Sequence, residues 1–331
     1  MQAAFEQGER PSTAPTSLHS PLVIGQCKTL DVDHAGLKLN LATSAQPSDE
    51  VARMWSDLAA EMAKMLSTPA KVTLIVTDRF VDTVRGLEGE VPETLGGTQN
   101  YDPTKPDGSL AVARTLPLHD RTVVVVNAGL VAMGRAAIRR VLHHEAQHVR
   151  LHQADDIAWA MHRRAPFERP IGFGYAHVYL AQSMIDEYRC EAAVASAVAR
   201  AATELDETPN GYPAIASLFC AIRTQFVKSG DLEAAYESSL IALNRLGPYL
   251  AYATATIARG ELRADEWLAV EPVRIVAETL LTIPPASTPR GYAELQGDVT
   301  DAVHALDAIS NHLGFKVGVD EDADQAFLYF Y

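Results

Sequence analysis

The five residues from His144 to His148 read H-E-A-Q-H and match the pattern H-E-x-x-H. Residues four positions apart lie on the same face of a helix, so His144 and His148 can present imidazole nitrogens to one metal ion. Glu145 lies about 100° further round the helix and can still reach a water molecule at that ion. Two imidazole ligands beside a carboxylate base form the core of a zinc hydrolase site. The sequence therefore predicts Zn²⁺ on the two histidines, with Glu145 as general base.

A catalytic zinc ion usually has three protein ligands and one open position, so a third ligand must come from elsewhere in the chain. The Ala-rich segment 176–205 is expected to form a long helix, and it carries Glu187 and Glu191 on one face. One arrangement puts Glu187 on the metal and lets Glu191 accept a hydrogen bond from the far nitrogen of a ligating histidine. The spacing alone leaves open which glutamate is the ligand. An ordinary solvated acidic face is the alternative.

The segments that must position the motif have recognisable patterns. Apolar residues recur at helical intervals across 134–153 without a proline, which predicts that the motif lies in the second half of a helix. The β-branched run 122–126 predicts a strand before it, followed by a turn at 127–129. Strand, turn and helix then follow in order, and the turn directs the chain into the motif helix.

Other segments supply the rest of the N-terminal half. An amphipathic helix capped by Ser48 is expected over 48–66, and a strand is expected over 71–77. Residues 85–120 are rich in Gly, Pro, Asp and Thr, so we expect a long loop or hairpin beside a substrate cleft. Residues 154–175 are expected to form a loop at the site.

The chain after residue 205 is expected to be mostly helical. Candidate helices are 212–228, 232–246, 249–259 and 301–313, and a stiff linker is expected at 282–289. The aromatic residues 327–331 are expected to form a docked terminal strand.

The residues of the motif resemble those of a known family. The strand ending near Asn127, followed by H-E-x-x-H-x-x-L-H from His144 to His152, is similar to the ImmA/IrrE-type metallopeptidases. The helix that carries Glu187 followed by small residues is similar to the ligand helix of that family. The resemblance covers roughly residues 70–200, and it implies zinc on His144, His148 and Glu187 with Glu145 as base. It also implies a zincin-like core and cleavage of a regulatory protein as one possible activity.

Several residues are candidates for stabilising the oxyanion that forms during amide hydrolysis. They are His152, His177, Tyr175, Tyr179 and Arg189. His152 lies on the same helical stripe as the two motif histidines, so it can lie near the metal. Alternatively, it lies near the helix end, where an imidazolium charge suits the helix dipole.

Composition excludes several classes of protein. The net charge of −14 at pH 7 argues against direct binding to nucleic acid or to an anionic membrane. Long apolar runs of about 18 residues are absent, so no membrane span is expected. Three isolated cysteines without a C-x-x-C pair suit a reducing compartment, which favours a cytoplasmic protein.

These observations define the expected organisation. We expect an α+β fold in which a small sheet packs on the motif helix in a zincin-like core. A mobile tail is expected at 1–21, a metallopeptidase domain at 22–205 and a helical region at 206–331. The expected function is zinc-dependent hydrolysis of a peptide bond in a peptide or regulatory protein, with Glu145 activating the water at the metal. The alternatives are a metal hydrolase of a non-peptide amide, or a non-catalytic interaction protein with a structural metal.

Overall fold

The structure is a computed structural model of the 331-residue chain. It describes residues 28–31, 36–92, 95, 111–159, 161–164, 166–170, 172–195, 198, 212–261, 268, 270–320 and 325–330. The tail expected at 1–21 and the boundary expected near residue 205 lie outside the described residues. The described part contains eight α-helices and seven strands, so the protein is mostly helical and has the predicted α+β class.

The N-terminal half is built on one five-stranded sheet. Its strands are β1 (Lys28–Asp31), β2 (Lys38–Ala42), β3 (Val72–Thr77), β4 (Ala113–Pro117) and β5 (Thr122–Asn127), and their order across the sheet is β1-β2-β3-β5-β4. The central strands β2, β3 and β5 run parallel, whereas β1 and β4 run antiparallel to their neighbours. β4 is therefore an edge strand of the described sheet, and it pairs with the strand that leads into the motif helix.

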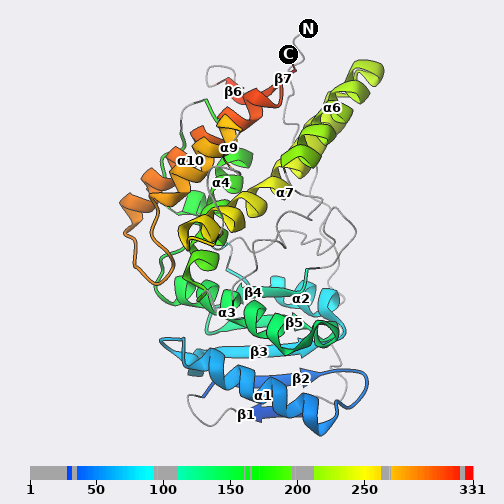
Figure 1. Cartoon of the computed structure of the whole chain (residues 1–331), viewed down its shortest axis with the longest axis vertical. Helices are drawn as coiled ribbons and strands as arrows, with labels where there is room; N and C mark the ends of the chain where they lie inside the picture. Colours follow the sequence, from blue (N-terminus) through cyan, green and yellow to red (C-terminus); the bar gives the residue numbers. More distant parts are fainter. Residues whose placement is uncertain are drawn as a thin grey trace.

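Two helices cover one face of this sheet. They are α1 (Asp49–Ala63), capped by Ser48 as predicted, and the motif helix α3 (Gly134–Gln153). Trp55 and Ile138 from these helices are buried with Val124 of β5 in one apolar core. Figure 1 shows this sheet and its helices at one end of the molecule, with the C-terminal helices at the other.

A shorter helix covers the opposite face. α2 (Phe80–Glu88), which the sequence did not predict, packs with Val123 and Val125 of β5 and with Leu116 of β4. Successive side chains of a strand point to opposite faces, so the valine run of β5 supplies both cores. That is why the run has no polar residue between its ends.

The turn before α3 sets the start of the motif helix. The side chain of Asn127 accepts a hydrogen bond from the backbone N–H of Gly129 at 2.9 Å and caps the 3-10 helix η3 (Ala128–Met133). Gly134 then has φ of 85°, a conformation that glycine adopts at little cost, and α3 continues to Gln153. The predicted order of strand, turn and helix is confirmed, and α3 has the predicted extent, whereas β5 is one residue longer than predicted and η3 extends the expected turn to Met133.

The rest of the described chain is helical apart from a terminal hairpin. It comprises α4 (Tyr175–Ala193), α6 (Tyr212–Ser229), α7 (Leu232–Ala258), α9 (Glu271–Leu281), α10 (Tyr292–His312), β6 (Phe315–Asp320) and β7 (Gln325–Phe330). Buried residues of α4 such as Ile185 share a core with Leu243 of α7 and Val303 of α10. α4 also contacts α3, so it links the motif helix to the C-terminal helices. The predicted terminal strand is confirmed by the pairing of β7 with β6.

Three predictions of helix extent are wrong. The helix expected over 301–313 is α10, which begins at Tyr292. Residues 232–258 form the single helix α7, although a break was expected at Pro248, which removes a backbone donor. Leu246 and Leu250, on either side of the proline, are buried in the same core, and this packing offsets the missing hydrogen bond. α4 ends at Ala193, well before residue 205, because Val194 already has extended backbone with ψ of 128°.

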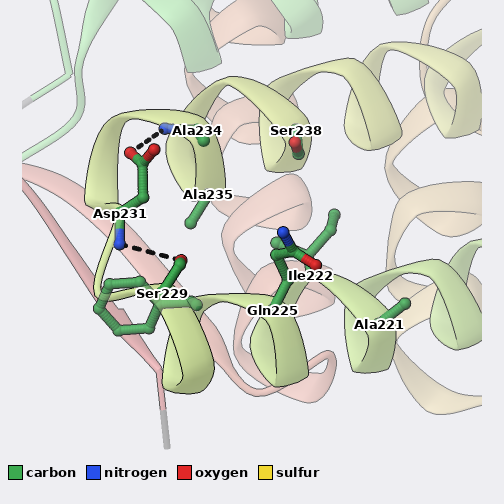
Figure 2. A pocket seen from close by; sticks show the side chains of 9 residues that line it. Ala221, Ile222, Gln225, Ser229, Asp231, Ala234, Ala235 and Ser238 are labelled. Carbon is green, nitrogen blue, oxygen red and sulfur yellow. Dashed lines mark hydrogen bonds between the residues drawn. The ribbon is translucent and has the colours of Figure 1, made fainter.

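A tight turn joins α6 to α7 (Figure 2). Gly230 has φ of 70° in this turn. Ser229 Oγ accepts a hydrogen bond from the Asp231 N–H at 3.1 Å, and the Asp231 carboxylate accepts one from the Ala234 N–H at 3.0 Å and caps α7.

None of the described helices combines the length and apolar composition that a membrane-spanning segment requires.

Candidate metal centre

His144, His148 and Glu187 come together where α3 contacts α4. The two Nε2 atoms of the histidines are 3.2 Å apart. The oxygens of Glu187 lie 3.3 Å from His144 Nε2 and 3.6 Å from His148 Nε2. The residues expected as ligands from their spacing are therefore neighbours in space, and together they could hold a metal ion.

These separations match those of a tetrahedral ion. Ligand atoms placed about 2.0–2.1 Å from a tetrahedral zinc ion lie about 3.4 Å from one another. The Nε2 atoms are 3.2 Å apart, and the two Glu187 oxygens lie at similar distances, Oε2 3.3 Å from His144 Nε2 and Oε1 3.6 Å from His148 Nε2. Two imidazoles and one carboxylate are also a donor set that catalytic zinc sites use. The three side chains could thus hold a metal ion of this size.

Glu191 lies behind His144 as seen from this group. Its Oε2 atom is 3.1 Å from His144 Nδ1. A proton on Nδ1 would be donated to this carboxylate and would leave the lone pair of Nε2 directed at the other ligands. The sequence left the roles of the two glutamates open, and the structure places only Glu187 against both Nε2 atoms.

The charges around His144 make this a site for a cation. Burial lowers the pKa of His144, but its hydrogen bonds to Glu187 and Glu191 and their charges outweigh burial and raise the pKa to about 10. Burial would likewise raise the pKa of Glu187, yet the two histidines hold it well below its usual range. Without a metal, the two carboxylates therefore favour the imidazolium form of His144, in which both ring nitrogens carry a proton. A metal ion that binds Nε2 has to displace the proton on that nitrogen.

The group is reachable by solvent on one side. The side chains of His144, His148 and Glu187 keep 12, 16 and 23% of their accessible surface, whereas Glu191 keeps 3%. Structural zinc sites are closed by four protein ligands. Within the described part of the chain this group offers three, so a bound ion would keep a position for water.

Glu145 follows His144 on α3 but faces a different partner. It is buried, and its Oε2 atom accepts a hydrogen bond from Thr115 Oγ1 of β4 at 2.6 Å. Thr115 lies in the segment expected as a loop or hairpin, and the pairing of β4 with β5 shows a hairpin there. Sequence reasoning missed Thr115 because an isolated threonine in a β-rich segment gives no sign of a partner thirty residues away.

Helix α7 contributes two residues that sequence reasoning also missed. The Tyr252 hydroxyl donates a hydrogen bond to Glu187 Oε2 at 2.7 Å. Arg259, at the end of α7, donates to the backbone carbonyl of Glu191 at 2.8 Å. Neither residue belongs to a motif, so no signal in the local sequence identifies them.

His152 lies in the last turn of α3, as one of its two interpretations expected. Burial, together with the nearby charges of His148 and of two arginines, lowers its pKa to about 3. These surroundings disfavour the imidazolium charge that would suit the helix dipole. His143 hydrogen bonds with Glu61 of α1 through Nε2 at 2.8 Å.

Arg189 and Asp186 hold the connection between α3 and α4. The Arg189 guanidinium is fully buried and pairs with both carboxylate oxygens of Asp156 at 2.7 and 3.0 Å. Asp186 accepts hydrogen bonds from the N–H groups of Ala158 and Trp159, and burial raises its pKa to about 6. Arg189 is therefore used for anchoring α4 and not for stabilising an oxyanion.

The remaining oxyanion candidates have contacts elsewhere. His177 is fully buried in the C-terminal core beside Phe173, and burial lowers its pKa. Tyr179 packs edge-on against Trp159 with ring centroids 4.5 Å apart. Tyr175 is 56% exposed at the start of α4. The structure brings none of these side chains into the His144 group.

Two further features lie outside the candidate site. They are Cys190 and the pocket between α6 and α7 that Figure 2 draws, called here the hollow. Cys190 is buried in an apolar cluster with Leu151 and Ile157, and burial raises its pKa well above the usual value. The hollow lies at the α6–α7 turn, about 30 Å from Tyr252 along the helix axis. Its one carboxylate, Asp231, already caps α7.

The candidate metal centre is thus supported by local geometry. It includes three converging ligand atoms, a carboxylate behind one imidazole and a second carboxylate held by a threonine. No protein-family model, no curated protein and no solved structure matches this chain.

Proposed function

We propose that the protein is a zinc-dependent metallopeptidase whose metal is held by His144, His148 and Glu187. The observation that carries this proposal is the convergence of the two Nε2 atoms and the Glu187 carboxylate at separations of 3.2–3.6 Å. The solvent access of the group favours a catalytic ion over a structural one.

The chain's own residues supply the remaining chemistry. A zinc ion there would polarise the scissile carbonyl and lower the pKa of a coordinated water from 15.7 to near neutrality. Glu145 takes a proton from the attacking water and delivers it to the leaving amine as the C–N bond breaks. Thr115 holds the Glu145 carboxylate through one oxygen and leaves the other free to accept that proton. Glu191 keeps the His144 ring in place.

The edge strand supports a peptide as substrate. Within the described sheet, β4 pairs on one side only, with β5. An extended peptide could add to its outer edge by main-chain hydrogen bonds, as in β-strand addition. Such a peptide would run past Thr115 and therefore past the base. The resemblance to ImmA/IrrE-type metallopeptidases, with their zincin-like core, supports the same reaction, and the sparse free cysteines support a cytoplasmic location.

The test measures zinc content and cleavage of a broad peptide library by mass spectrometry. Glu145→Gln should retain one zinc ion per chain and lose about 10²- to 10⁴-fold in cleavage rate, because the amide cannot accept a proton. Glu50→Gln, at the exposed start of α1, is the matched control and should behave as wild type.

Three results would change the assignment. Full cleavage by Glu145→Gln would remove Glu145 as the base. A zinc-loaded wild type that cleaves no peptide would point to a non-peptide amide, since the same groups would serve that hydrolysis. Loss of folding on zinc removal, together with inactivity, would favour a structural metal in an interaction protein.

A further inference from the structure

Helix α7 contacts both glutamates of the candidate metal centre. Tyr252 donates its O–H to Glu187 Oε2 at 2.7 Å, the same oxygen that lies 3.3 Å from His144 Nε2. The Tyr252 ring also packs edge-on against the His144 ring at 5.8 Å between centroids. Two helical turns further along, Arg259 donates to the Glu191 carbonyl at 2.8 Å and lies 3.8 Å from Glu191 Oε1.

Small residues let α7 approach α4 this closely. Gly247 faces Met184 of α4, and a Cβ atom added there would lie 3.8 Å from the Met184 side chain. Ala251 and Ala255, one and two turns further along α7, are fully buried in the shared core. Larger side chains at these positions would push the helices apart and separate the Tyr252 hydroxyl from Glu187.

We propose that Tyr252 is a positioning residue that fixes the Glu187 carboxylate for metal binding, with Arg259 holding Glu191 through its backbone carbonyl and through an ion pair with its carboxylate. The C-terminal helix α7 thereby completes the hydrogen-bonded shell around a metal centre whose ligands come from α3 and α4. This role rests on the proposed metal centre. Part of the affinity of that centre for zinc would then come from residues of α7, which are not ligands themselves.

The physical basis is the freedom of the Glu187 side chain. A glutamate has three rotatable bonds, and its terminal torsion is broad, so the carboxylate can turn away from the two histidines. A hydrogen bond to one oxygen restricts that torsion and reduces the entropy lost on metal binding. Partners of this kind usually contribute 10- to 100-fold to metal affinity.

The experiment uses Tyr252→Phe in the full-length protein, because this change removes the O–H and keeps the ring that packs on His144. Zinc affinity is measured by competition with a chromophoric chelator, and Co²⁺ is added separately to record the ligand-field absorption. We expect zinc to bind about 10- to 100-fold more weakly, with an altered Co²⁺ spectrum. Tyr236→Phe, on the same helix about 24 Å away along its axis, is the matched control and should leave both readouts unchanged.

Arg259→Gln gives an independent measurement should Tyr252→Phe fold poorly. It removes the guanidinium beside Glu191 and should weaken zinc binding by a smaller factor, since it acts on a residue behind a ligand. Wild-type zinc affinity and Co²⁺ spectrum in both variants would overturn the inference. Unchanged affinity with a large fall in turnover for Tyr252→Phe would also overturn it, because the hydroxyl would then act on the substrate.

Failure of this inference is distinguishable from failure of the proposed function. If wild type binds no zinc, or if zinc-loaded wild type cleaves no peptide, the proposed function fails. If wild type binds zinc and Glu145→Gln is inactive while both α7 variants match wild type, only the role of α7 fails.

Discussion

Helices α3 and α7 contribute to the same candidate metal centre in different ways. α3 presents two ligand atoms from one face, because His144 and His148 are one turn apart and their Nε2 atoms lie 3.2 Å apart. α7 presents no ligand, and its Tyr252 and Arg259 reach the glutamates of α4 through hydrogen bonds. The difference indicates that the ligands on α3 are a local property of one helix, whereas the orientation of the third ligand depends on packing between distant segments.

The largest effect is expected when a candidate ligand is removed from α3. His148→Ala should lower zinc affinity by about 10³-fold or more and abolish cleavage, because only one imidazole and one carboxylate would remain. The matched control is His143→Ala on the same helix, whose ring contacts Glu61 and not the metal group. Equal zinc affinity in the two variants, measured by chelator competition, would show that the α3 histidines are not ligands.

The second prediction concerns pH and the proton on His144. Because its pKa is raised to about 10, zinc binding at neutral pH must release about one proton, and affinity should rise about tenfold per pH unit up to that pKa. In the metal-free protein the raised pKa stabilises the fold below pH 6.5, and this contribution is lost as the pH rises through about 10. Calorimetry in buffers of different ionisation enthalpy counts the protons. Affinity that does not change between pH 6 and 8 would contradict the proton competition.

The smallest expected effect comes from the residue that holds the base. Thr115→Val keeps the shape of the side chain and removes the hydrogen bond to Glu145 Oε2. We expect about a tenfold lower kcat with unchanged zinc affinity, because an ordinary hydrogen bond contributes about 0.5–1.5 kcal/mol. Steady-state cleavage and zinc titration on the same preparation check it, with Thr83→Val on α2 as control. A loss of zinc in Thr115→Val would mean that β4 supports the ligands and not the base.

Much of the N-terminal half could be predicted from local pattern. The helical intervals of 134–153 and the β-branched run before them are short-range signals, and α3 and β5 form where they indicate. The Ser48 cap is equally local, since its oxygen accepts from a backbone N–H three residues away. Local pattern predicted less well where tertiary packing determines the extent of a helix. Pro248 favours a break, but α7 continues through it because Leu246 and Leu250 on either side are buried in the core.

Helical periodicity places residues four apart on one face, so the sequence alone indicates that His144 and His148 can share an ion. It likewise indicates that Glu145, next to His144, is the candidate base. Only the tertiary structure decided that Glu187 and not Glu191 lies against both Nε2 atoms, that Thr115 holds Glu145, and that Tyr252 reaches Glu187. These contacts join segments between 30 and 65 residues apart. No periodicity encodes such pairs, and they arise from the way that the sheet, α4 and α7 pack.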